Sequence, residues 1–119
     1  VSGRRKIAMS LFLIHIEHFT RAHGTEPALA FAGDSPAALA EAIEDALQRP
    51  MLFARWCALQ HEPDKVPVAL GALDPAANVR AESRDLHVEL EIRSTLPMKI
   101  IAQRLTWLIG PHWDVRNVK

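Results

Sequence analysis

The stretch DLHVELEIRSTLPMKIIAQRLTWLIGPHWDVRNV, residues 85–118, decides the fold. In residues 86–93 every second residue is apolar and alternates with His, Glu or Arg, which is typical of a strand with one buried and one polar face. Residues 95–110 then carry apolar residues at helical spacing, with a proline in the first turn and a glycine at the end. Residues 112–118 close the unit as a short strand. A strand, a helix and a strand in this order predict a right-handed crossover between two parallel strands.

The preceding segments supply the other expected elements. Residues 8–19 alternate as a strand, and residues 28–32 are expected to pair with it as a hairpin after a Gly- and Pro-containing turn. Residues 35–48 predict a helix that begins at Ser35, because serine is a good N-cap and proline follows it. Residues 51–60 favour a second helix by composition, with a strand as the main alternative. Residues 61–84 show no lasting period, so they are expected to form a long loop, which either hides a short helix or strand near residues 68–73 or is a binding loop. An ordered wrap against the core is favoured, because Val66, Val68, Leu70 and Leu73 are expected to be buried.

The expected fold is therefore a two-layer α+β sandwich, in the order β-β-α-α-loop-β-α-β. It has a mixed, roughly four-stranded sheet with about three helices mainly on one face, because the polar side of residues 86–93 leaves the other face open. We expect one globular domain over residues 9–119 and a flexible extension over residues 1–8. Met9 is an alternative start, so the sequence leaves open whether that extension belongs to the native protein. The element order resembles a ferredoxin-like or swapped α+β layout in general terms, and such a likeness implies no function.

Composition argues against several functional classes. The chain of 119 residues is 49% hydrophobic and carries 14 basic and 14 acidic residues. It therefore lacks the basic excess of most nucleic-acid-binding domains, and Lys99, Arg104, Trp107 and Trp113 are only weak candidates for such contacts. No apolar run reaches the roughly 20 residues of a membrane span. The single cysteine, Cys57, predicts a reducing, cytoplasmic setting. Ten arginines against four lysines, with 18 alanines, suggest a GC-rich bacterial genome.

Candidate chemistry is confined to histidines and glutamates. The sequence has no nucleophile elbow, no glycine-rich phosphate loop and no carboxylate pair in an apolar setting, so we predict no catalytic residue and no cofactor. His15 and His18 fall on opposite faces of a strand and cannot readily share one ion. The weak metal candidates are two pairs that each share a strand face: His15 with Glu17, and His87 with Glu89. They converge only if their strands are neighbours, at Cβ spacings of about 5 Å, and the sequence does not decide this.

An apolar stripe suggests a surface for association. Leu11, Leu13 and Phe19 fall on the same face of the first strand as His15, and exposed patches of this kind usually mark interfaces. Either a second copy of the chain or the 61–84 loop is expected to cover them, and His87 and Arg93 complete the tentative interface.

Two functions stay open at this point. The leading expectation is a non-enzymatic protein–protein interaction module that acts as a homo-oligomer, with no nucleic acid or membrane as partner. The alternative is a small-ligand or metal-binding domain, possibly enzymatic, that uses the histidines and carboxylates of the sheet face and the 61–84 loop. The sequence identifies no ligand, partner or pathway for either.

Overall fold

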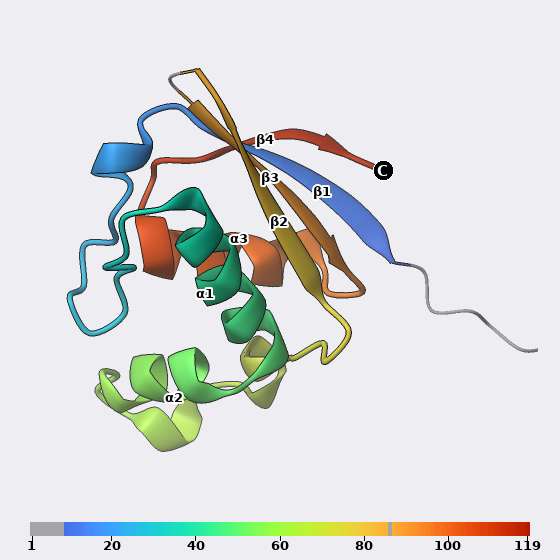
Figure 1. The fold of residues 1–119 in the computed structure, drawn as a ribbon. Helices are drawn as coiled ribbons and strands as arrows, with labels where there is room; N and C mark the ends of the chain where they lie inside the picture. Colours follow the sequence, from blue (N-terminus) through green and yellow to red (C-terminus); the bar gives the residue numbers. More distant parts are fainter. Residues whose placement is uncertain (1–8, 86) are drawn as a thin grey trace, which may run out of the picture.

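A computed structural model describes residues 9–85 and 87–119, so the expected extension over residues 1–8 lies outside the described part (Figure 1). The described chain contains four strands and three α-helices, together with short 3₁₀ turns. In chain order they are β1 (Ser10–Ile16), α1 (Pro36–Gln48), α2 (Met51–Ala58), β2 (Asn78–Arg84), β3 (His87–Ser94), α3 (Met98–Ile109) and β4 (Asp114–Val118).

The strands form one sheet in the order β2-β3-β1-β4, and every recorded pairing is antiparallel. Because β3 and β4 both run antiparallel to β1, they are parallel to each other across it, as the segment 85–118 predicts. With α1 and α2 taken as one helical connection, this is the β-α-β-β-α-β arrangement of the ferredoxin-like fold. The predicted mixed sheet is wrong in one respect: β1 separates the two parallel strands, so no two neighbours are parallel.

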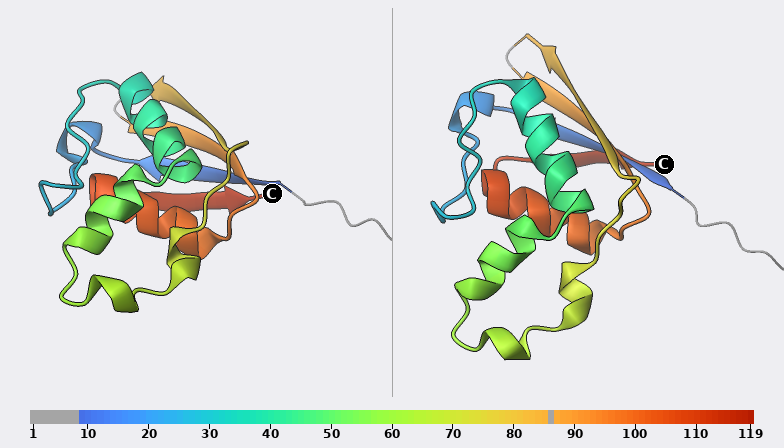
Figure 2. Two further views of the ribbon diagram at one scale, coloured as in Figure 1. Left: turned by 90° about the horizontal axis from the view of Figure 1, so that it is seen from below. Right: turned by 60° about the horizontal axis from the view of Figure 1, so that its bottom comes forward.

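The two-layer α+β architecture is confirmed, and all three helices lie on one side of the sheet (Figures 1 and 2). Helices α1 and α3 pack next to the sheet, and α2 lies farther away. One hydrophobic core fills the space between the layers, with Ile14, Ile43, Leu90 and Leu105 among its fully buried members. Ser35 caps α1 as expected, since its side chain accepts a hydrogen bond from the Ala38 N–H at 3.1 Å. Within residues 9–85 and 87–119, no helix is long and apolar enough to cross a bilayer.

The expected hairpin of residues 8–19 with residues 28–32 is absent. Both places beside β1 are taken by β3 and β4, and residues 28–32 form a turn and irregular chain instead. Leu29 and Phe31 are nevertheless buried, and the Phe31 N–H donates to the Leu108 carbonyl at 2.8 Å. The alternation of apolar residues therefore reports burial against α3 and not a strand.

The segment 61–84 holds a strand that the sequence analysis missed. Its last seven residues are β2, while its first part contains the 3₁₀ turns Pro63–Lys65 and Val68–Gly71. This first part packs on the helical side, where Arg104 of α3 donates hydrogen bonds to its backbone. It therefore does not cover the open sheet face. Val68, which was expected to be buried, is 90% exposed.

Candidate metal centre

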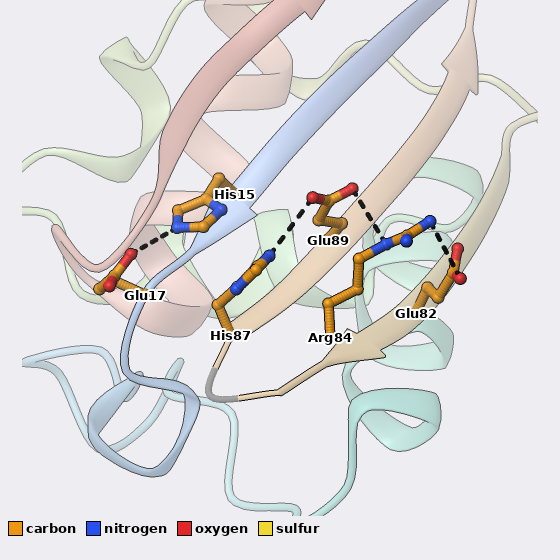
Figure 3. A network of polar contacts seen from close by, with 6 residues as sticks. All are labelled: His15, Glu17, Glu82, Arg84, His87 and Glu89. Carbon is orange, nitrogen blue, oxygen red and sulfur yellow. Dashed lines mark hydrogen bonds and ion pairs between the residues drawn. The ribbon is translucent and has the colours of Figure 1, made fainter.

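Strand pairing brings the two predicted histidine and glutamate pairs together on the open face of the sheet. In the β1–β3 register His15 lies directly opposite Glu89. His87 is two residues before Glu89 on β3, so its side chain lies on the same face. As a result, one donor atom from each of His15, His87 and Glu89 lies within 4.8 Å of the other two (Figure 3). The two strands that carry these residues, β1 and β3, are therefore neighbours, which the sequence left undecided.

His15 is held in place by Glu17 and His87. It is 6% exposed, and its Nε2 hydrogen-bonds to Oε2 of Glu17 at 2.6 Å. Its ring lies 4.5 Å from that of His87, centroid to centroid. The hydrogen bond from His15, together with the charges of nearby histidines, lowers the pKa of the Glu17 carboxyl against the opposing effect of desolvation. Glu17 engages Nε2 of His15, which leaves Nδ1 on the side of the ring that faces Glu89 (Figure 3).

Glu89 is held from two sides. Its Oε1 accepts a hydrogen bond from Nε2 of His87 at 3.3 Å, and its Oε2 lies 3.6 Å from Nε of Arg84. Arg84 in turn contacts Oε1 of Glu82 at 3.1 Å. The polar chain thus runs across the ends of three strands, from β1 through β3 to β2 (Figure 3). Each carboxylate in it has a cationic or hydrogen-bond-donating neighbour, which fixes its orientation.

The hairpin of β2 and β3 sets the positions of Arg84 and His87. These two residues are directly paired at the end of the hairpin, and Asp85, which follows Arg84, has a φ of 53°. Aspartate is one of the few residues other than glycine that adopts this left-handed conformation readily. Because Arg84 is paired directly with His87, it lies next to Glu89 on the same face of the sheet and reaches its carboxylate.

The cluster lines a hollow of about 630 Å³ on the open face. Residues from all four strands contribute to its wall, which combines apolar residues with several charges. Besides the donor cluster, these are Leu13, Ile14, Ala81, Leu90, Arg80, Glu82, Arg84, Glu91 and Arg116. The volume is within the range of small-molecule sites, roughly 300–1,000 Å³.

Two imidazoles and one carboxylate are a donor set with defined chemistry. Catalytic zinc sites use three protein ligands of this kind, and non-haem iron(II) sites use two histidines and one carboxylate, in both cases with positions left open. For metal–ligand bonds of about 2.0 Å, donors around a tetrahedral ion lie roughly 3.3 Å apart. The present separations are at most 4.8 Å, so each pair of donor atoms has to approach by no more than about 1.5 Å to reach that spacing.

The tentative interface residues do not all lie together. Leu11, Leu13, His87 and Arg93 are on the open face, where the two leucines are half-buried. Phe19 is not, because β1 ends at Ile16 and Phe19 begins the 3₁₀ turn Phe19–Arg21. Its ring packs against that of Phe31 at 6.4 Å. The strand alternation was extended three residues too far, so Phe19 was assigned to the wrong surface.

The sequence analysis missed the arginines of the hollow, Arg80, Arg84 and Arg116. Two of them belong to β2, which was not recognised as a strand. A polar residue at every second position, Asn78, Arg80, Glu82 and Arg84, was the signal that could have identified its outward face. Comparison with protein-family models, curated proteins and solved structures finds no match to this chain.

Proposed function

We propose that this domain binds one divalent transition-metal ion through His15, His87 and Glu89 and presents it to the hollow of the open sheet face. The observation that carries the proposal is the convergence of these three donors, from strands far apart in the sequence, within 4.8 Å. Three protein ligands leave coordination positions for a further ligand. A metal in such a site polarises a bound oxygen or activates water, so the proposal includes an enzymatic role.

The surroundings of the donors support this function. In metal sites a ligating histidine almost always gives its second ring nitrogen to a carboxylate, carbonyl or water, which fixes the ring and raises its basicity. Glu17 is placed for this role at His15, with Nε2 engaged at 2.6 Å. Arg84 similarly orients the carboxylate of Glu89. The imidazole-rich set favours zinc, iron or copper over calcium and magnesium, which prefer oxygen ligands alone.

We expect the purified chain to bind zinc or cobalt at one ion per molecule in a titration followed by calorimetry, and to retain it in native mass spectrometry without chelators. Replacing His15 or His87 with alanine removes a ligand. The affinity should then fall by more than the roughly 10- to 100-fold that loss of an outer-shell partner causes. Glu17→Gln changes only the outer partner of His15, so the loss of metal affinity in this variant should lie within the 10- to 100-fold range.

His61→Ala serves as the matched control, because His61 is an exposed histidine in the segment between α2 and β2. The metal affinity and stoichiometry of this variant should equal those of the unmodified chain. A chain that takes up no stoichiometric metal, or one in which all three histidine variants bind equally well, would contradict the proposal.

A second candidate function is self-association through the same face, in the bacterial cytoplasm that the composition and the lone cysteine favour. The observation behind it is that Leu11 and Leu13 lie side by side on a face which no described segment covers (Figures 1 and 2). Arg93 lies opposite Leu11 and Glu91 lies opposite Leu13, so charges of both signs border the two leucines.

For this candidate, the double substitution Leu11→Glu with Leu13→Glu should convert a dimer to a monomer in size-exclusion chromatography with light scattering. Each leucine buried between copies contributes roughly 1.5–3 kcal/mol before the cost of association. Val68→Glu is the control, since Val68 is exposed on the helical side. If the unmodified chain were monomeric at every protein concentration measured, self-association through this face would be ruled out.

A further inference from the structure

We infer that the hollow beside the metal centre takes a compact acid, whose carboxylate or phosphoryl oxygens ligate the metal while Arg80 and Arg116 hold the rest of the group. This inference rests on the proposed metal site and adds the chemical class of its ligand.

The two arginines are placed on opposite sides of the hollow. Arg80 is on β2 and Arg116 on β4, the two edge strands of the sheet, and both line the same hollow as the donor cluster. In the part of the chain that the structure describes, neither forms an ion pair. Arg84 differs, because Glu82 and Glu89 already engage it. Guanidinium groups match the geometry of carboxylate and phosphate oxygens, with two parallel N–H donors.

The acidic residues of the hollow limit the size of the ligand. Glu82 is paired with Arg84 at 3.1 Å. Glu91 lies between Arg80 and Leu13 in the strand register and breaks the positive surface into two parts. A long polyanion would meet this carboxylate along its length, whereas a compact acid bridges the metal and one or both arginines. The volume of about 630 Å³ admits such a molecule.

The test uses the chain loaded with cobalt, whose visible spectrum responds to a change of ligand. Malonate and inorganic phosphate are titrated separately, which distinguishes a carboxylate from a phosphoryl ligand. We expect at least one to bind with a spectral change. Arg80→Gln and Arg116→Gln should each weaken that binding by roughly 10- to 100-fold, the equivalent of one charge-assisted hydrogen bond, while leaving cobalt affinity unchanged.

Arg55→Gln is the matched control, because Arg55 is an exposed arginine of α2 that does not line the hollow. It should bind the anion as the unmodified chain does. This inference is overturned if the cobalt-loaded chain binds neither anion. It is also overturned if the anion still binds after both arginines have been replaced. In both cases the metal proposal is unaffected. A chain that binds no cobalt contradicts the metal proposal, and this inference fails with it.

Discussion

Replacing Arg104 with leucine should destabilise the protein by about 3–5 kcal/mol, the largest effect on stability that we expect from a single substitution. Arg104 is fully buried in α3, and its guanidinium donates to the backbone carbonyls of Ala46, Leu70 and Ala72 at 3.0–3.3 Å. Leucine fills much of the space but donates no hydrogen bond. Each carbonyl left buried without a partner costs about 1–3 kcal/mol.

The reason for so large an effect is that Arg104 joins three parts of the chain. Its side chain links α3 to the end of α1 and to the 3₁₀ turn before β2. Its guanidinium also lies over the rings of Phe53 and Trp107, at 5.7 and 5.2 Å from their centroids. Burial lowers the pKa of Arg104, yet an arginine remains protonated at neutral pH. The carbonyl dipoles and the aromatic faces therefore take the place of a counter-ion.

Urea denaturation measures this prediction, and hydrogen exchange over residues 68–73 should show that the turn loosens first. A loss of 3–5 kcal/mol corresponds to a Tm decrease of roughly 10–20 °C for a domain of this size. Arg55→Leu, at an exposed arginine of α2, should change stability by less than about 0.5 kcal/mol. Equal stabilities for the two variants would show that the buried guanidinium contributes little.

Arg104 also shows what the sequence could and could not predict. It stands between Ile101 and Leu108 on the apolar stripe of α3, which is a signal for burial. It was nevertheless considered for nucleic-acid contacts, together with Lys99 on the same helix. Its partners here are carbonyls of an irregular segment, and no sequence pattern marks such partners. The sequence predicted the elements whose apolar residues recur with a clear period, which are α1, β1, β3 and α3. It did not predict the contacts that irregular segments of the chain make.

Strand order was the second limit. β2 was missed because it is an edge strand, with only Val79 buried among mainly exposed neighbours, so it lacks an apolar face of its own. The candidate donors on β1 and β3 were identified correctly in pairs, since the two-residue period places each histidine and its glutamate on one face. Whether the pairs meet depends on which strands are neighbours, and that is decided by packing of the whole core. The sequence therefore identified the donor residues of the proposed metal centre but not their convergence.

Replacing Asp74 with asparagine should destabilise the fold by about 2–4 kcal/mol at neutral pH. Asp74 is buried before β2, and its Oδ2 accepts hydrogen bonds from the Ser94 hydroxyl and the Thr95 N–H at 2.9 and 3.0 Å. Its Oδ1 accepts from the Ala76 N–H at 2.9 Å. An asparagine has only one acceptor oxygen, so its amide group must face an N–H or O–H donor. The junction between β3 and α3 then loses its link to the start of β2.

The same residue makes stability depend on pH. Burial raises the pKa of the Asp74 carboxyl, but the hydrogen bonds from Thr95, Ser94 and Ala76 outweigh it, and the net pKa is lowered. The unfolded chain therefore binds a proton at a higher pH than the folded chain does. The stabilising contribution is complete above the unfolded value of about 4 and is lost as the pH falls through the folded pKa. Unfolding free energy should decrease below about pH 4, and Asp74→Asn should remove that part of the decrease.

Urea titrations at several pH values between 2 and 7 test this. Asp64→Asn, at an exposed aspartate in the turn Pro63–Lys65, is the control and should keep the pH profile of the unmodified chain. If the Asp74→Asn profile ran parallel to that of the unmodified chain at acidic pH, the carboxylate of Asp74 would not be the group that titrates. If the profile flattened, the buried carboxylate of Asp74 would be the group whose protonation destabilises the fold at acidic pH, and the hydrogen bonds that it accepts from Ser94, Thr95 and Ala76 would be the interactions lost.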